Sequence, residues 1–240
     1  MSKHVTLGQR LRERYITNMT YLGTNYTRGE IYVHSTDIDR TLMSAMSNLI
    51  GFYGPSSRPD VDYPAISSWP GNYLPIPIHT VNNTVDYVAS TEAYCPRQDA
   101  VKSAMNQTPE FAALMQAKGW VFETVSNYSG ESLVNPVDEG HDWGNSNFPF
   151  WKFFDALYIE SLWGMAPPDW LTPDLYNELD YIHDVYDDWM EGIGLSPVRG
   201  LNFSLEMPKL RGGSLLWTFI GNMQKKVACI KEAASEWREF

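Results

Sequence analysis

Between residues 31 and 49 the hydrophobic pattern changes from that of a strand to that of a helix. Residues 31–34 form a short β-branched run, and apolar side chains then recur at helical spacing at positions 38, 42, 45, 46 and 49. The turn between them offers Thr36 or Asp37 as a cap for the free backbone amides at the helix start. Arg40 follows in the first helical turn. This segment therefore predicts a strand, a tight turn and a helix start that carries an arginine.

A helix start beside an arginine is suited to binding an anion. Unpaired amides point out of the first turn, the helix dipole places positive charge there, and a guanidinium binds two oxygens of a phosphate at once. The pattern by itself favours a simpler alternative, in which Arg40 is a surface or ion-paired residue, because many α/β proteins have an arginine near a helix start.

The rest of the chain is mainly helical in pattern, with few strand signals. Residues 1–52 predict a helix, then the strand and helix described above, and residues 54–77 are rich in proline and glycine and predict a loop. The remaining elements are a strand within 76–81, helices over 97–130 and 150–163, a loop over 130–147, a helix that starts at Thr172-Pro173 and a last helix after Gly212-Gly213. This order fits a helical cap inserted into an α/β core.

Composition and charge narrow the possible functions. The 240 residues are 43% hydrophobic, enough to bury a sizeable core, and the formal net charge is -11. Nucleic acids attract basic surfaces, so this charge argues against a nucleic-acid partner. A phosphomonoester needs only a local group of arginines, so acidity does not exclude it. No apolar run approaches the length of a membrane span, and the histidines and cysteines lack the spacing of metal ligands.

Six N-glycosylation sequons indicate a secreted or lysosomal protein, because only about two are expected by chance at this composition. They begin at Asn18, Asn25, Asn82, Asn106, Asn127 and Asn202. Met1 opens onto a polar stretch without a signal peptide, so we expect the signal to lie upstream of Met1. Cys95 and Cys229 either pair with each other or remain free thiols, since sequence alone cannot place them close together.

The segment 35–49, STDIDRTLMSAMSNL, and three other blocks occur in an order that a known family shares. These blocks are LGQRLRERY at 7–15, LPIPIHTV at 74–81 and LRGGSLLW at 210–217. Together they resemble the histidine acid phosphatases, the branch that includes the prostatic and lysosomal enzymes. The resemblance implies an α/β fold: an incomplete histidine-phosphatase-like core, with a parallel-type sheet and flanking helices, and a large inserted α-helical cap. We expect residues 1–90 to form part of that core, residues 91–205 the mainly helical cap, and residues 206–240 a helix that returns to the core.

The resemblance implies acid phosphatase activity, but two catalytic segments of the family are absent. Family members attack a phosphomonoester with the histidine of an Arg-His-Gly motif, form a phosphohistidine, and protonate the leaving alcohol from a His-Asp motif. No histidine here lies between arginine and glycine, while His141-Asp142 falls in a polar loop and His183-Asp184 within a helical pattern. We therefore expect negligible turnover from this chain. The alternative is a secreted noncatalytic glycoprotein that binds an anionic ligand or a protein partner.

The same resemblance supplies the candidate site residues. Arg40 matches the arginine that grips the transferred phosphate, which makes it the catalytic and the main substrate-binding candidate. Tyr73 matches an aromatic that shapes leaving-group preference, and Arg12 matches a helix arginine near the site, with a salt-bridge role as the alternative. His34 stands where many relatives have arginine and is not assigned as a nucleophile, and His79 is interpreted as structural. The family implies small phosphomonoester substrates, no cofactor and no metal, and it leaves homodimerisation open.

Overall fold

The computed structural model describes residues 1–71, 73–90, 93–137 and 150–233. The chain divides into two compact units, Met1–Ala93 and Tyr94–Phe240. The last helix belongs to the second unit, whereas we expected residues 206–240 to return to the α/β part. The predicted division into a core, a cap and a returning helix stays a prediction.

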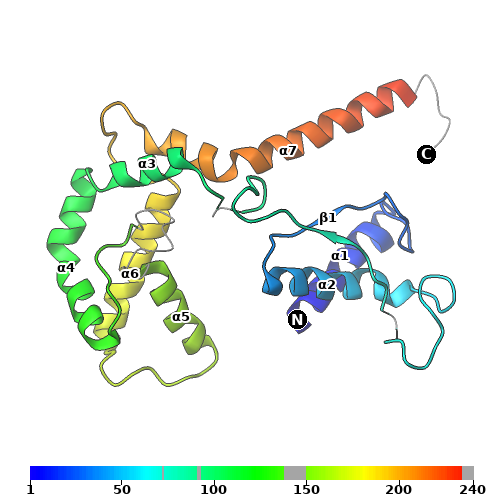
Figure 1. Ribbon diagram of the computed structural model, residues 1–240, viewed down its shortest axis with the longest axis horizontal. Coiled ribbons are helices and arrows are strands. Elements are labelled where there is room, and N and C mark those ends of the chain that lie inside the picture. Colours follow the sequence, from blue (N-terminus) through cyan, green and yellow to red (C-terminus); the bar gives the residue numbers. More distant parts are fainter. Residues whose placement is uncertain (72, 91–92, 138–149, 234–240) are drawn as a thin grey trace. The chain divides into compact units, whose positions relative to one another are not determined.

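Two helices that pack side by side dominate the first unit (Figure 1). Helix α1 (Ser2–Arg12) continues into the π-helical segment η1 (Glu13–Asn18), and α2 (Asp39–Tyr53) runs into the 3-10 turn η2 (Gly54–Ser56). The two helices meet at Gly8 and Gly51. A Cβ atom on Gly8 would overlap the carbonyl oxygen of Asn48, and one on Gly51 would overlap that of Val5. The helices therefore approach at backbone distance, and the interface depends on the absence of these two side chains.

The small sheet of the first unit is parallel, as expected for an α/β core. Strand β1 (Val33–His34) pairs with β2 (Ile78–His79), with Val33 opposite Ile78 and His34 opposite His79. Each strand is two residues long, shorter than the apolar runs predicted. The hydrophobic core beneath them contains Ile16, Phe52, Tyr53 and Ile76.

The predicted cap of α2 is wrong, although the strand, turn and helix are confirmed. The residue at the N-cap is Ile38, which makes no side-chain capping bond. The Thr36 hydroxyl instead lies 2.9 Å from the hydroxyl of Thr41, and Thr41 donates to the Ile38 carbonyl at 2.8 Å. Neither Thr36 nor Asp37 therefore caps the helix through its side chain.

The described residues of the second unit form the helices α3 (Pro96–Met105), α4 (Pro109–Ser129), α5 (Phe150–Leu162), α6 (Pro173–Met190) and α7 (Phe203–Ala233). Helix α6 packs against α4 and α5, and α3 packs against α7 (Figure 1). Threonines cap two of these helices: Thr108 accepts a hydrogen bond from the Phe111 amide, and Thr172 accepts one from the Leu175 amide, as predicted. This helical assembly matches the predicted helical middle of the chain.

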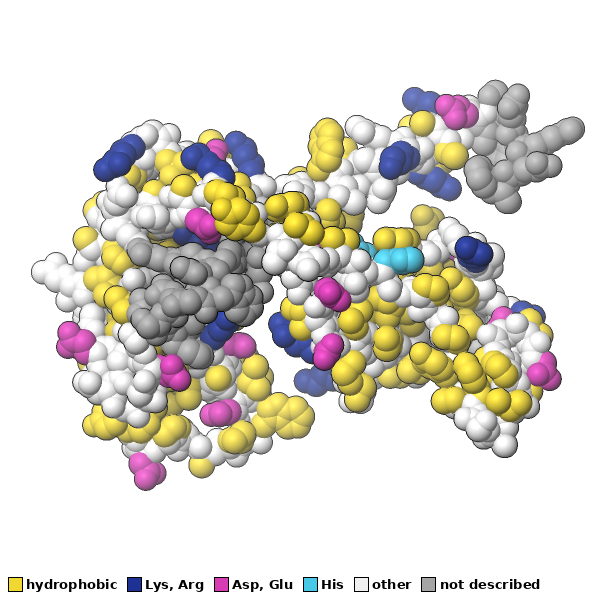
Figure 2. Space-filling model, viewed as in Figure 1, with side chains coloured by type: hydrophobic (Ala, Val, Ile, Leu, Met, Phe, Trp, Pro, Cys, Tyr) yellow, Lys and Arg dark blue, Asp and Glu magenta, His cyan; other side chains and the backbone are white. Residues whose placement is uncertain are grey.

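Helix α7 begins at Phe203, eleven residues before the start predicted after Gly212-Gly213. The side chain of Asn202 accepts hydrogen bonds from the amide and hydroxyl of Ser204 at 3.1 and 2.8 Å, which satisfies the helix start. Phe203 and Met207 are buried at 1% and 0% exposure in the core with α3, α4 and α6. This packing stabilises the first turns of α7, so Gly212 and Gly213 lie inside the helix. Further along, α7 exposes a stripe of apolar residues, part of the hydrophobic surface seen in Figure 2: Leu216, Trp217, Met223, Val227 and Ile230.

Other features of the sequence can be located in the described part of the chain. His183 lies on α6, where its ring is 3.6 Å from the carboxylate of Asp187. Cys95 and Cys229 are both free thiols. No helix in the described ranges is long and apolar enough to cross a membrane, and these ranges contain no group of three metal-ligating side chains. His141-Asp142 and most of the predicted loop at 130–147 lie outside the described residues.

Candidate anion-binding site

Arg40 lies in the first turn of α2, six residues after β1 ends, and its side chain is exposed. Among the described residues, no hydrogen bond or ion pair engages its guanidinium. The amides of Thr41 and Leu42 both donate to the Ile38 carbonyl, at 3.0 and 3.1 Å, so the helix ladder begins at Thr41. The amides of Asp39 and Arg40 precede that ladder and have no backbone acceptor in the described part of the chain. Arg40 and these two amides therefore form a helix start with free donors, next to the carboxylate of Asp39.

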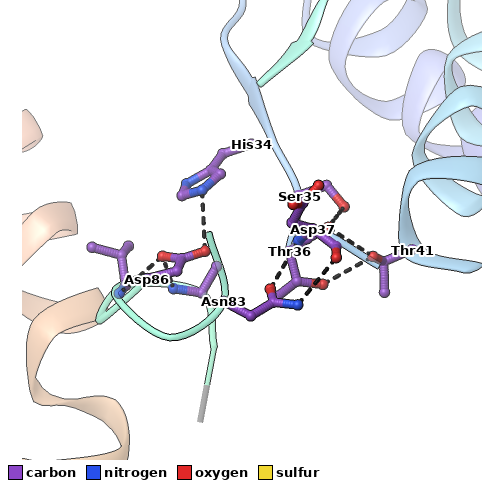
Figure 3. Close-up of polar contacts among 9 residues, drawn as sticks. His34, Ser35, Thr36, Asp37, Thr41, Asn83 and Asp86 are labelled. Atoms are coloured by element: carbon purple, nitrogen blue, oxygen red, sulfur yellow. Dashed lines mark hydrogen bonds and ion pairs between the residues drawn. The ribbon is translucent and has the colours of Figure 1, made fainter. Parts of the chain in front are cut away.

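Asn83, from the segment after β2, binds the turn that leads into α2 (Figure 3). Its side-chain oxygen accepts a hydrogen bond from the Asp37 amide at 3.0 Å, and its side-chain nitrogen donates to the Asp37 carbonyl at 3.1 Å. Both backbone groups of Asp37 are thus held by one neutral side chain. We call this pair of bonds the Asn83 clamp.

His34 and Asp86 face each other beside the clamp (Figure 3). The Nε2 atom of His34 lies 3.4 Å from one carboxylate oxygen of Asp86, which is 2% exposed. The other carboxylate oxygen accepts hydrogen bonds from the amides of Val88 and Ala89, at 3.2 and 3.0 Å. The pair forms an ion pair when His34 is protonated, and it joins the segment after β2 to the end of β1.

The sequence reasoning missed Asn83 and Asp86. Both follow β2 by a few residues, and the carboxyl ends of parallel strands meet at one edge of a sheet, where α/β proteins bind ligands. Applied to the two predicted strands, this rule points to the residues that follow each strand, which include Asn83 and Asp86. His79 stands at the same edge, with its ring stacked on that of Tyr32 at 4.6 Å. Neither strand histidine is therefore a free side chain.

Arg12 lies at the other end of α2 from Arg40. Its guanidinium donates to the Phe52 carbonyl at 2.9 Å and to the Ser56 hydroxyl at 3.1 Å. Phe52 is twelve residues from Arg40, a rise of about 18 Å along a helix. The structure does not bring the two arginines together, and the contacts of Arg12 are those of a residue that secures the end of a helix.

Tyr73 lies in the loop that precedes β2. Its carbonyl accepts a hydrogen bond from the indole nitrogen of Trp69 at 2.9 Å, and the two rings lie 6.3 Å apart. In the described part of the chain, no contact joins Tyr73 to Arg40. Of the three predicted site residues, Arg40 alone lies at the carboxyl edge of the parallel strands.

The chain was compared with known proteins. It matches a family model described as histidine phosphatase superfamily (branch 2) over residues 1–238. Lysosomal acid phosphatase of Rattus norvegicus is 32% identical over 224 residues, which are 93% of this chain and 46% of that protein. Lysosomal acid phosphatase of Homo sapiens is 33% identical over 217 residues, 90% of this chain and 45% of that protein. Prostatic acid phosphatase of Rattus norvegicus is 30% identical over 230 residues, 93% of this chain and 52% of that protein. The chain thus spans about half the length of the curated relatives it matches.

Proposed function

Because this chain belongs to the histidine phosphatase superfamily (branch 2), we propose that it is part of an acid phosphatase and that Arg40 binds the phosphate of a small phosphomonoester. The observation that carries this proposal is the environment of Arg40: an exposed guanidinium without a partner among the described residues, at a helix start with two free amides. A guanidinium and amides in this arrangement neutralise the charge that spreads over phosphate oxygens during transfer.

We further propose that the chain by itself has negligible turnover. Its five histidines occur in the contexts Lys-His-Val, Val-His-Ser, Ile-His-Thr, Gly-His-Asp and Ile-His-Asp, so none has the Arg-His-Gly context of the family nucleophile. In a complete family member, the nucleophilic histidine attacks phosphorus and the alcohol leaves with a proton from an acid. Arg40 stabilises charge in that reaction but supplies neither the nucleophile nor the proton.

Phosphate binding and turnover, measured on the same unglycosylated protein, test both statements. We expect inorganic phosphate to bind the wild type at pH 5, and Arg40→Ala to weaken that binding at least about tenfold, because a charged hydrogen bond contributes about 1.5–3 kcal/mol. Arg10→Ala is the matched control, since Arg10 is an exposed arginine on α1. Hydrolysis of an aryl phosphate should equal the rate without protein. Turnover that disappears in Arg40→Ala would contradict the proposed inactivity. Equal phosphate affinity in Arg40→Ala and Arg10→Ala would contradict the proposed site.

The second candidate function is that of a secreted or lysosomal noncatalytic glycoprotein that binds an anionic ligand. It is favoured by the exposure of four sequon asparagines, Asn18, Asn82, Asn127 and Asn202. Expression in secretory cells would test it: glycans at these positions together with phosphate binding and no hydrolysis support this function. An unglycosylated secreted product would contradict it.

A further inference from the structure

We infer that Asn83 is a positioning residue for the anion site and that the His34–Asp86 pair anchors it to β1; this inference rests on the proposed phosphate binding by Arg40. Asn83 is 46 positions from Asp37 in sequence, and the two residues follow strands that pair with each other. It joins the two segments whose carboxyl ends form the site.

The clamp acts on the main chain directly before the helix. Asp37 is two residues before the first residue of α2, and Asn83 fixes both its amide and its carbonyl. Because a peptide group is planar, two bonds to one residue set the direction in which the chain enters the helix. The direction of the free amides of Asp39 and Arg40 follows from that entry. An uncharged amide side chain does this without neutralising Arg40.

The segment that carries Asn83 is itself held at both ends. Before the clamp, the side chain of Asn82 accepts hydrogen bonds from the amide and hydroxyl of Thr84 at 3.0 and 2.7 Å, which closes a tight turn. After the clamp, the buried Asp86 carboxylate faces His34. The amide of Ser35, the residue after His34, donates to the His79 carbonyl at 3.0 Å. The loop, both strands and the turn before α2 are therefore linked in one network (Figure 3).

The clamp is not part of the hydrophobic core of the first unit. Asn83 is half-buried and Asp37 is exposed, whereas the core consists of Ile16, Phe52, Tyr53 and Ile76. Loss of the clamp should therefore affect the anion site more than overall stability. Binding to a turn that is not already ordered carries the cost of ordering it, so affinity falls when the clamp is removed.

The test uses Asn83→Ala in the full unglycosylated chain, with inorganic phosphate as the probe. This substitution removes both bonds of the clamp but leaves the residues Asn82 and Thr84 of the sequon unchanged. We expect phosphate affinity to fall about fivefold to tenfold, as for the loss of one to two hydrogen bonds. We also expect faster hydrogen exchange at the Asp37 amide, and an unfolding midpoint close to that of the wild type. Asn202→Ala is the matched control, because the Asn202 side chain also makes two hydrogen bonds, in the second unit.

The outcomes separate this inference from the proposed function. Phosphate binding that Arg40→Ala abolishes and Asn83→Ala leaves unchanged would overturn the positioning role of Asn83 alone. Absence of phosphate binding by the wild type would overturn the proposed site and this inference with it. Equal loss of affinity in Asn83→Ala and Asn202→Ala, with unchanged exchange at Asp37, would identify a general structural effect and also overturn the positioning role.

Discussion

Replacing Gly51 with alanine tests the backbone contact between α1 and α2. A Cβ atom on Gly51 would overlap the carbonyl oxygen of Val5, and it would lie 2.9 Å from the carbonyl carbon of Val5 and 3.0 Å from the amide nitrogen of Gln9. All three atoms belong to the backbone of a neighbouring helix, so no side-chain rotation relieves the clash. The helices must instead separate by about 1.5 Å to restore ordinary van der Waals distances.

The expected loss of stability is the difference between two opposing effects. Alanine favours a helix over glycine by about 1 kcal/mol. Overpacking a close interface costs about 1–3 kcal/mol, and a rigid backbone clash lies at the upper end of this range. We therefore expect Gly51→Ala to lower the free energy of unfolding of the first unit by about 2 kcal/mol.

Hydrogen exchange of the α2 amides reports the stability of the first unit separately from that of the second. Gly119→Ala is the matched control, because Gly119 lies within α4 and its Cβ atom would have no heavy atom within 4 Å. That control should gain about 1 kcal/mol from helix propensity alone. A Gly51→Ala protein as stable as the wild type would show that the helices do not meet at backbone distance.

Three further predictions concern side chains with defined partners. Arg12→Ala removes hydrogen bonds to the end of α2 and should destabilise the first unit by about 2 kcal/mol, measured by exchange of its amides. Burial raises the pKa of Tyr53 from 10.0 to about 12, so stability that is present below pH 10 should be lost as the pH rises through 12. Tyr53→Phe should reduce that alkaline loss in denaturant titrations, without lowering stability at neutral pH, because the buried hydroxyl has no partner among the described residues. The hydrogen bond from the Ser196 hydroxyl lowers the pKa of Glu110, so this contact stabilises the fold above the ordinary glutamate pKa. The stabilisation is lost as the pH falls through the lowered pKa. Ser196→Ala should therefore make the free energy of unfolding of the second unit less dependent on pH in this acidic range.

The local features of the fold could be predicted from sequence, because neighbouring residues determine them. The strand and helix around Arg40 follow from the spacing of apolar residues, and the start of α6 follows from a threonine cap before a proline. The start of α7 differs from the prediction, because packing of its first turns outweighs the local signal of the two glycines. Phe203 and Met207 are buried against other helices, and that packing is not visible in the local pattern.

The site was predicted less completely than the fold. Arg40 became a candidate through the resemblance of its segment to the family, because the local pattern alone favours a surface or ion-paired arginine. Asn83 and Asp86 could not be located, because their partners are brought close only by the pairing of β1 with β2, and strands of two residues have no periodicity to align. The position of Arg12 depends in the same way on how α1 crosses α2, which is set by two glycines rather than by a charge pattern.

The cap of α4 buries part of the sequon at Asn106. Thr108, the third residue of that sequon, is 1% exposed, and its hydroxyl donates to the Met105 carbonyl while it accepts from the Phe111 amide. A glycosylating enzyme must recognise this threonine, so it can act only before α4 has packed. In a secretory cell, the fraction of chains glycosylated at Asn106 would therefore report how fast the second unit folds. Slow folding would allow a glycan to be added there, and fast folding would leave the asparagine unmodified.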